Sequence, residues 1–232
     1  LERTPVNYIE SLKFYPDIEG CALKAELVCE GEGEAEIAVT YDGRLVGEAK
    51  GYVKYRRAFD IKLGEKHLWE IGNGRLYDVT VRYCGDEVKS YFGLRQVGYD
   101  GMKFMLNGKS VFQRLSLDQG YYPDGLYTAP DDESMRRDVE LGLRLGFNGA
   151  RLHQKVFDPR FLYHCDRAGY LVWGEFPSWG VDYENLSALG TLVGEWTEAV
   201  ERDFNHPSII TWCPLNETWE SLKDARKVRD VR

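Results

Sequence analysis

Apolar and polar residues alternate in short runs along the first hundred or so residues of the chain. The period of two is clearest over residues 25–29, 35–41 and 77–83. Turn signals interrupt the pattern at 31–33 (Gly-Glu-Gly), 42–43 (Asp-Gly) and 72–74 (Gly-Asn-Gly). Short strands bounded by such turns, with no helical period between them, are typical of an antiparallel β-sandwich. The pattern therefore predicts an antiparallel β-sandwich over residues 1–96.

The period changes after a linking segment at 92–97 and an Asn-Gly hairpin signal at 107–108. From there, short apolar strands alternate with amphipathic helices. The expected strands are 110–118, 147–153, 170–176 and 209–215, and the expected helices are 131–145, 159–168 and 186–204, with one more beginning near Glu220. We expect Gly146 and Gly169 to end the first two helices in the left-handed conformation. Such alternation indicates parallel strands joined by right-handed crossovers.

Four strand–helix units make about half of a (β/α)8 barrel, which typically needs ~250 residues. The predicted fold class is therefore multidomain, β plus α/β: the sandwich is followed, over residues 97–232, by the N-terminal half of a (β/α)8 TIM barrel. A half-barrel would expose strand edges and an apolar interior. For that reason, and because residues 1–5 do not resemble a natural N-terminus, we expect the natural polypeptide to be longer.

The charge balance is acidic and argues against polyanionic partners. Lys and Arg number 30 and Asp and Glu number 38, so the formal net charge is −8. Without a Lys/Arg block, neither nucleic acid nor an anionic membrane is expected as a partner. No apolar run reaches membrane-spanning length and no secretory signal opens the chain, so we expect a cytoplasmic protein of bacterial type. The sequence leaves a homo-oligomer open.

Cysteine and histidine spacing does not indicate a metal centre. The five cysteines lack metal-ligand spacing. Trp69 lies too far from Cys29 for an immunoglobulin-type bridge between Cys29 and Cys84, so we expect reduced, buried thiols. His-Glu-x-x-His, Cys-x-x-Cys and phosphate-cradling glycine motifs are missing, and the four histidines are scattered. We expect no metal and no cofactor.

Polar and aromatic side chains follow each expected parallel strand. In a barrel the carboxyl ends of the strands converge on one site. Hydrogen-bonding groups with aromatic walls suit a neutral, polyhydroxylated ligand such as a sugar. The predicted substrate-binding residues are Asp118, Arg151, His153, Glu175, Trp179, Asn216 and Trp219.

Glu217 is the predicted catalytic residue. Cleavage of a glycosidic bond needs one protonated carboxyl group and a second carboxylate. A carboxyl group on a rigid strand, walled by tryptophan, can have its pKa raised as a general acid requires. The alternative is that Glu217 simply follows a strand and faces water. Asn216, beside it, could hold the 2-hydroxyl group of the sugar.

Three of the other candidates have a structural alternative. Arg151 could orient a carboxylate in the site or form a structural ion pair, and the two roles can coexist. His153 could take part in binding, but packing or a neutral hydrogen bond is the favoured interpretation. Glu175 could be the partner carboxylate, but a buried structural acid bonded to Arg151 or to loop amides is favoured.

Several ordered motifs together resemble glycoside hydrolase family 2, the β-galactosidase, β-glucuronidase and β-mannosidase group. The matching stretches are 68–77, Phe-Gly-Leu-Arg at 92–95, Leu-Asn-Gly-Lys at 106–109, Phe-Asn-Gly-Ala-Arg at 147–151, Cys-Asp-Arg-Ala-Gly at 165–169, Asn-His-Pro-Ser-Ile-Ile at 205–210 and Asn-Glu at 216–217. The resemblance implies a jelly roll, an immunoglobulin-like sandwich and a catalytic barrel, with this chain running from the sandwich to the middle of the barrel. It also implies that Glu217 is the acid/base, that Asn216 binds the 2-hydroxyl group, and that the nucleophile is a Glu beyond this chain.

The chain departs from the family pattern in places. Leu152-His153-Gln154 stands where β-galactosidases usually have a Ser-His pair after the arginine. The histidine-rich turn after the first barrel strand is replaced by residues 118–122, and the magnesium ligands of some β-galactosidases have no counterpart near Trp179. The departures thus fall at positions that the resemblance connects with galactose specificity and with magnesium binding.

The resulting hypothesis is a fragment of a retaining, β-galactosidase-like exo-β-glycosidase that hydrolyses terminal β-linked sugars. Because the nucleophile is expected outside the chain, the isolated fragment should be inactive. The alternatives are a non-catalytic carbohydrate-binding or scaffold module, and a structural half-barrel that assembles with another chain.

Overall fold

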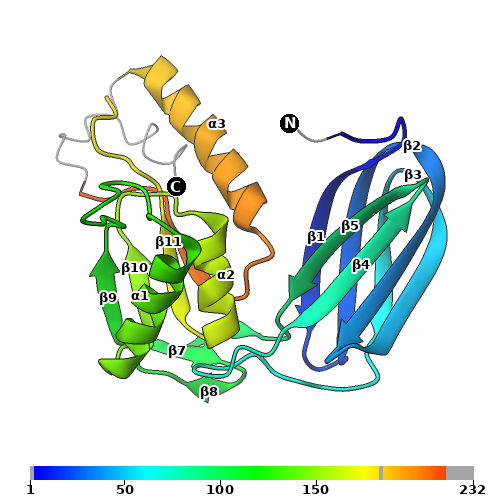
Figure 1. The fold of residues 1–232 in the computed structure, drawn as a ribbon, viewed down its shortest axis with the longest axis horizontal. Helices are drawn as coiled ribbons and strands as arrows, with labels where there is room; N and C mark the ends of the chain where they lie inside the picture. Colours follow the sequence, from blue (N-terminus) through cyan, green and yellow to red (C-terminus); the bar gives the residue numbers. More distant parts are fainter. Residues whose placement is uncertain (1–2, 183–184, 218–232) are drawn as a thin grey trace. The chain divides into compact units, whose positions relative to one another are not determined.

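A computed structural model describes residues 3–182 and 185–217 (Figure 1). The chain divides into two compact units, Leu1–Phe112 and Gln113–Arg232. The small hairpin sheet of β6 (Val97–Asp100), β7 (Lys103–Leu106) and β8 (Lys109–Ser110) groups with the first unit, whereas the sequence analysis assigns these residues to the second domain.

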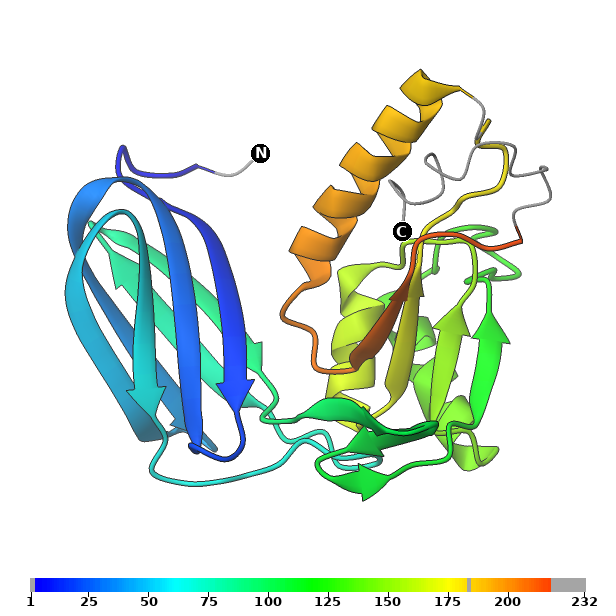
Figure 2. The same ribbon diagram turned by 180° about the vertical axis from the view of Figure 1, so that it is seen from behind.

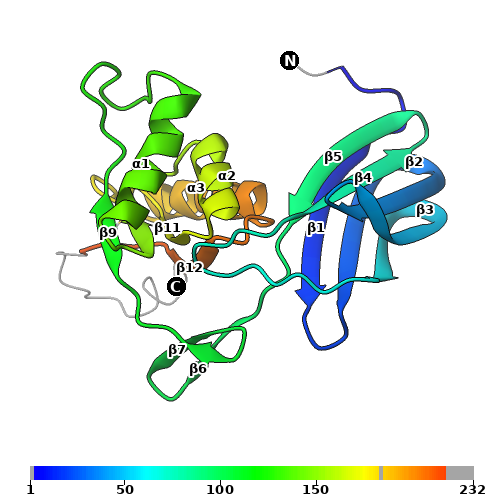
Figure 3. The ribbon, with the colours of Figure 1, turned by 60° about the horizontal axis from the view of Figure 1, so that its bottom comes forward.

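The first unit is built on one curled antiparallel sheet (Figures 1 and 3). Its strands are β1 (Ile9–Asp17), β2 (Ala22–Tyr41), β3 (Arg44–Lys62), β4 (Tyr77–Tyr83) and β5 (Asp86–Phe92). β3 pairs with one edge of β2 along almost its whole length, while β1 and β4 share the other edge, one at each end of β2. This arrangement bends the two long strands around an apolar core, as in a β-sandwich.

Residues 25–29 and 35–41 belong to one continuous strand, which corrects the predicted turn between them. The pairing of β2 with β3 skips from Val28–Arg56 to Glu32–Lys54, and Gly31 has φ +80°. A β-bulge of this kind bends a strand without ending it, and glycine tolerates the left-handed backbone that the bulge needs. The glycine signal at 31–33 therefore marks the curl of the sheet.

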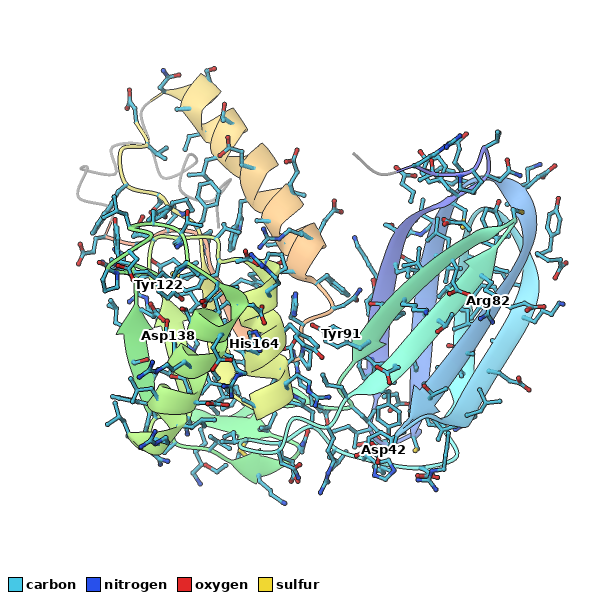
Figure 4. The ribbon with its side chains drawn as sticks, viewed as in Figure 1. Asp42, Arg82, Tyr91, Tyr122, Asp138 and His164 are labelled. Carbon is cyan, nitrogen blue, oxygen red and sulfur yellow. The ribbon has the colours of Figure 1, made fainter. Side chains whose placement is uncertain are left out.

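The Asp42-Gly43 turn is confirmed as the β2–β3 hairpin, at the lower end of the sheet in Figure 4. Asp42 has φ 49° and Gly43 has φ 75°, the two positive values that a type I′ turn requires. A tight primed turn fixes the register of both long strands, and with it the set of side chains that face the core.

All five cysteines are free, as the sequence predicts. Cys29 and Cys165 are buried, but Cys84 is exposed, so the expectation of burial is wrong for this residue. Cys84 has φ 48° in the turn between β4 and β5, outside both strands.

The second unit contains a four-stranded parallel sheet in the order β12-β11-β10-β9. Its strands are β9 (Leu115–Asp118), β10 (Gly149–Leu152), β11 (Leu171–Glu175) and β12 (Ile209–Cys213), and its helices are α1 (Asp132–Arg144), α2 (Pro159–Ala168) and α3 (Leu186–Asp203). The predicted alternation of parallel strands and helices is confirmed up to β12. The helix predicted from Glu220 lies outside the described residues.

Helix ends follow the local sequence. The side chains of Asp131 and Asp158 accept hydrogen bonds from the first turns of α1 and α2. Gly169 is the C-cap of α2 and has φ 69°. Gly146 follows Leu145, the C-cap residue of α1, and has φ 90°. The predicted glycine stops are thus confirmed, and they set where β10 and β11 begin.

The helices pack on one face of the parallel sheet, as the rear view shows for α1 and α2 (Figure 2). Met135 and Val139 of α1 meet Ala150 and Leu152 of β10 in the apolar core. On α3, Trp196 makes edge contacts with Phe176 and Trp212. Within residues 3–182 and 185–217, none of the helices has the length and apolar character needed to cross a membrane.

Candidate functional site

Arg151 joins the carboxyl ends of three neighbouring strands. Its neighbours in β10, Ala150 and Leu152, face the helices, so alternation places Arg151 on the opposite face of the sheet. Its Nε donates to Glu175 Oε2 at the end of β11 (2.7 Å), and its Nη2 donates to Asn216 Oδ1 beyond β12. The guanidinium group thus holds a carboxylate and an amide in one plane, which its fork of donors suits.

The carboxylate of Glu175 is fully occupied. Its side chain has no exposed surface; one oxygen binds Arg151 and the other accepts the backbone N–H of Gln154 at 3.1 Å. The hydrogen bond that Arg151 donates to Glu175 holds the pKa of Arg151 above its ordinary value. These are the contacts of the structural acid that the sequence analysis favoured, bonded both to Arg151 and to a loop amide.

Asn216 is held on two sides and leaves one donor open. Only 8% of the residue is exposed. Its backbone N–H donates to Ser178 Oγ at 3.2 Å, and its Oδ1 accepts from Arg151. Its Nδ2 is buried and has no hydrogen-bond partner among the described residues. An unsatisfied buried N–H costs about 1–3 kcal/mol, so this group is suited to receive an oxygen of a ligand.

Glu217 is exposed to solvent, so the expectation of a carboxyl group on a rigid strand, enclosed by tryptophan, is wrong. Strand β12 ends at Cys213, two residues earlier than predicted, and residues 214–217 carry the carboxyl group beyond the sheet. Trp219, one of the expected walls, lies outside the described residues. Glu217 nevertheless remains near enough to Arg151 for its charge to favour the guanidinium form. Its φ of 46° is an uncommon backbone conformation for a residue other than glycine.

His153 and Trp179 lie together on the same side of the site. The side-chain amide of Gln119 donates to His153 Nδ1 at 2.8 Å. The rings of His153 and Trp179 meet edge to face with centroids 5.2 Å apart. His153 thus has both a hydrogen bond and a packing contact within the protein. Trp179 is 57% exposed, so its face is open to a ligand.

Asp118 lies on the opposite face of the sheet from Arg151. It pairs in register with Leu152, and both side chains face the helices. Burial raises the pKa of the Asp118 carboxyl, and the like charge of Asp138 on α1 adds to this. Burial, with the charge of Asp138, also raises the pKa of the Tyr122 hydroxyl group above its ordinary value. Asp118 Oδ1 accepts the Gly120 N–H at 2.7 Å and so shapes the loop after β9.

Three side chains that connect the loops were not predicted from the sequence as part of the site. Gln154 and Ser178 are buried and hydrogen-bonded to each other (3.3 Å) beneath the candidate site. The ammonium group of Lys155 donates to the carbonyls of Gly120 and Tyr127 (2.8 and 2.7 Å) and lies 4.1 Å from the Tyr127 ring centroid. Their only sequence signal was the departure from the family pattern after Arg151.

The described residues offer no metal centre: within 3–182 and 185–217, no three His, Cys, Asp or Glu side chains gather to hold an ion. The geometry instead shows an arginine, an amide with an open donor, a tryptophan face and an exposed carboxyl group along one edge of a sheet. Such a set can hydrogen-bond and stack on a sugar.

Comparison of the sequence with known proteins identifies clear relatives. A β-glucuronidase of Streptococcus agalactiae is 29% identical over 199 residues, which covers 76% of this chain and 32% of that protein. A β-galactosidase of Thermoanaerobacterium thermosulfurigenes is 32% identical over 174 residues, covering 72% of this chain and 24% of that protein. The chain is a homologue of the family 2 β-glucuronidases and β-galactosidases. No family model matches it.

Solved structures of the family have the same fold as this homologue. The β-glucuronidase of Ruminococcus gnavus in complex with D-glucuronic acid aligns with a TM-score of 0.88 at 22% identity, over 98% of this chain and 40% of that one. In sequence, the rat β-glucuronidase is 26% identical, and the match covers 97% of this chain and 37% of that protein. The chain therefore spans well under half the length of the relatives it matches.

Proposed function

We propose that the full-length protein is a retaining exo-β-glycosidase and that this chain supplies its acid/base residue. The observation that carries the proposal is Asn216, held by Arg151 and Ser178 with its Nδ2 open, directly before Glu217. The β-glucuronidase and β-galactosidase names of the relatives support a terminal β-linked sugar as substrate.

In the proposed reaction Glu217 gives its proton to the departing glycosidic oxygen. A second carboxylate attacks the anomeric carbon and forms a glycosyl-enzyme ester. Glu217, now ionised, then takes a proton from water, which hydrolyses the ester. Asn216 Nδ2 donates to the sugar's 2-hydroxyl group, a contact that strengthens in the transition state. Trp179 offers a ring for stacking.

We infer that the second carboxylate comes from the part of the polypeptide that this chain does not include. Glu175 is a poor candidate, because Arg151 and the Gln154 amide occupy both of its oxygens. We propose that the same part completes a (β/α)8 barrel begun by β9 to β12 and that it covers Glu217. The isolated chain should then turn over no substrate.

The test is hydrolysis of the methyl β-galactoside, β-glucuronide and β-mannoside, whose leaving oxygens need protonation, by the full-length protein. Glu217→Gln should lower kcat/KM by about 10²–10⁴-fold. Glu198→Gln, a change at an exposed position on α3, is the matched control and should leave the rate unchanged. Activity that survives Glu217→Gln would refute the role. Glycan binding without any hydrolysis would instead identify a carbohydrate-binding module.

A further inference from the structure

Gln154 is a junction between the ends of β10 and β11. It lies two residues beyond the end of β10, is 8% exposed and has φ 56°. Its backbone N–H donates to Glu175 Oε1 at 3.1 Å. Its side-chain Oε1 accepts the Trp179 N–H at 3.0 Å, and its Nε2 donates to Ser178 Oγ at 3.3 Å. Both ends of the amide are therefore used within the loop that follows β11.

Ser178 extends this connection to β12. It is 1% exposed, and its Oγ accepts a second hydrogen bond, from the Asn216 N–H at 3.2 Å. A continuous path thus runs from the Gln154 amide through one hydroxyl oxygen to the backbone of the residue before Glu217. Since every group on this path is buried, each bond is costly to lose.

The backbone at Glu217 needs such support. Its φ of 46° is sparsely populated by residues with a side chain, and conformations of this kind persist only where the surroundings impose them. Asn216 is fixed at its N–H by Ser178 and at its side chain by Arg151. With Asn216 held at two points, the direction in which the chain leaves toward Glu217 is set.

We propose that Gln154 is a positioning residue that aims the Glu217 carboxyl group by acting through Ser178 and Asn216. This inference rests on the proposed role of Glu217 as acid/base. The position requires one donor and one acceptor at the end of a two-carbon stem. Glutamate would keep the acceptor for Trp179 but could not donate to Ser178, and would place a negative charge beside the buried Glu175.

The kinetic test compares two β-glycosides of the same sugar in the full-length enzyme. A methyl glycoside needs protonation of its leaving oxygen, whereas a dinitrophenyl glycoside forms the glycosyl-enzyme without it. Azide is added as a nucleophile that needs no general base. Gln154→Met, Gln154→Glu and Ser178→Ala should each lower kcat/KM on the methyl glycoside by about 10–100-fold, as expected for a small displacement of a catalytic group. On the dinitrophenyl glycoside with azide, they should change it less than about 3-fold.

Gln96→Met is the matched control, because Gln96 is exposed and lies in the first unit. It should behave as wild type on both substrates. Equal losses on both glycosides, or wild-type rates for the Gln154 variants, would overturn the proposal. Ser178→Ala removes only one oxygen and provides the test should Gln154→Met fail to fold.

Amide hydrogen exchange at Asn216 gives a second measurement that does not depend on activity. Losing the Ser178 contact should speed exchange of this N–H by at least about tenfold in Gln154→Met, and leave it unchanged in Gln96→Met. Unchanged exchange in the Gln154 variant would contradict the link. If the wild-type protein hydrolyses no β-glycoside, the proposed function fails, and exchange alone decides whether Gln154 positions Asn216.

Discussion

The imidazole of His206 and the carboxylate of Asp166 are hydrogen-bonded, with Nδ1 and Oδ2 2.6 Å apart. Asp166 lies in α2 and has no exposed surface, and its other oxygen accepts the Ser208 N–H at 2.9 Å. The bond fixes the last turns of α2 to the segment that enters β12. Two of the motifs shared with the family, Cys-Asp-Arg-Ala-Gly and Asn-His-Pro-Ser, thus meet in one buried contact.

Asp166→Ala should therefore destabilise the second unit strongly. It leaves His206 and the Ser208 N–H without this buried acceptor, and removing one member of a buried pair costs about 3–5 kcal/mol. Asp166→Asn can still accept from Ser208 and donate to a neutral imidazole, so its cost should be about 1–2 kcal/mol. Urea unfolding followed by tryptophan fluorescence measures both, because Trp69 is the only tryptophan outside the second unit.

Asp124→Asn, at an exposed loop position, is the control and should stay within about 0.5 kcal/mol of wild type. A similarly small effect of Asp166→Ala would mean that the buried contact contributes little to the fold.

Periodicity was sufficient to predict the parallel sheet. The apolar runs of β10, β11 and β12 and their glycine-terminated helices are local signals, and parallel pairing follows from their alternation. Arg151, Glu175 and Asn216 could be expected to meet because they end neighbouring strands. Their contacts follow that expectation.

The sequence did not predict on which face of the sheet a strand residue lies, where β12 ends, or how the loops meet. Asp118 ends its strand, but the face that a strand residue occupies depends on register with its partner, and Asp118 pairs with the core residue Leu152. β12 stops early, so Glu217 lies outside the sheet. Gln154 and Ser178 meet across loops whose left-handed turn at Gln154 no pattern announces.

Stability should depend on the ionisation of Asp118. Burial, with the nearby charge of Asp138, raises its pKa above the ordinary value of 3.8. The folded state therefore binds this proton more tightly than the unfolded state. Its contribution to stability is complete below about pH 3.8 and is lost as pH rises through the raised pKa.

Asp118→Asn should raise the free energy of unfolding at pH 7 relative to wild type, and the difference should shrink as the pH falls toward 4. The amide oxygen can still accept the Gly120 N–H, so the loop geometry is kept. Urea midpoints between pH 4 and 8 measure the effect. A variant less stable than wild type at pH 7 would show that ionised Asp118 is on balance favourable in this site.

Position 149 in β10 has no room for a side chain, because the neighbouring strands β9 and β11 lie close to it. A Cβ atom there would lie 2.3 Å from the Leu171 carbonyl oxygen and 2.6 Å from Leu115 Cδ2. Because the first neighbour is backbone, Gly149→Ala must push β11 away, at a cost of about 1–3 kcal/mol. Gly190→Ala meets no atom within 4 Å in α3 and should instead stabilise by about 0.5–1 kcal/mol. Thermal unfolding of both variants checks the contrast, and equal melting temperatures would refute it.

Arg151→Lys tests whether the shape of the guanidinium group matters as well as its charge. Arginine bonds Glu175 and Asn216 with two separate nitrogens, whereas an ammonium group presents one point of charge and cannot hold both in the same plane. Without the hydrogen bond to its Oδ1, the side-chain amide of Asn216 can rotate, and its Nδ2 no longer points in a fixed direction. With the proposed glycosidase function, kcat/KM of the full-length protein on a β-glycoside should fall by about 100-fold, the typical effect of an ångström-scale misplacement. Arg137→Lys, exposed on α1, should leave the rate unchanged. Should Arg151→Lys keep a third or more of wild-type kcat/KM, charge alone would be sufficient, and the planar link between the two strand ends would not contribute to catalysis.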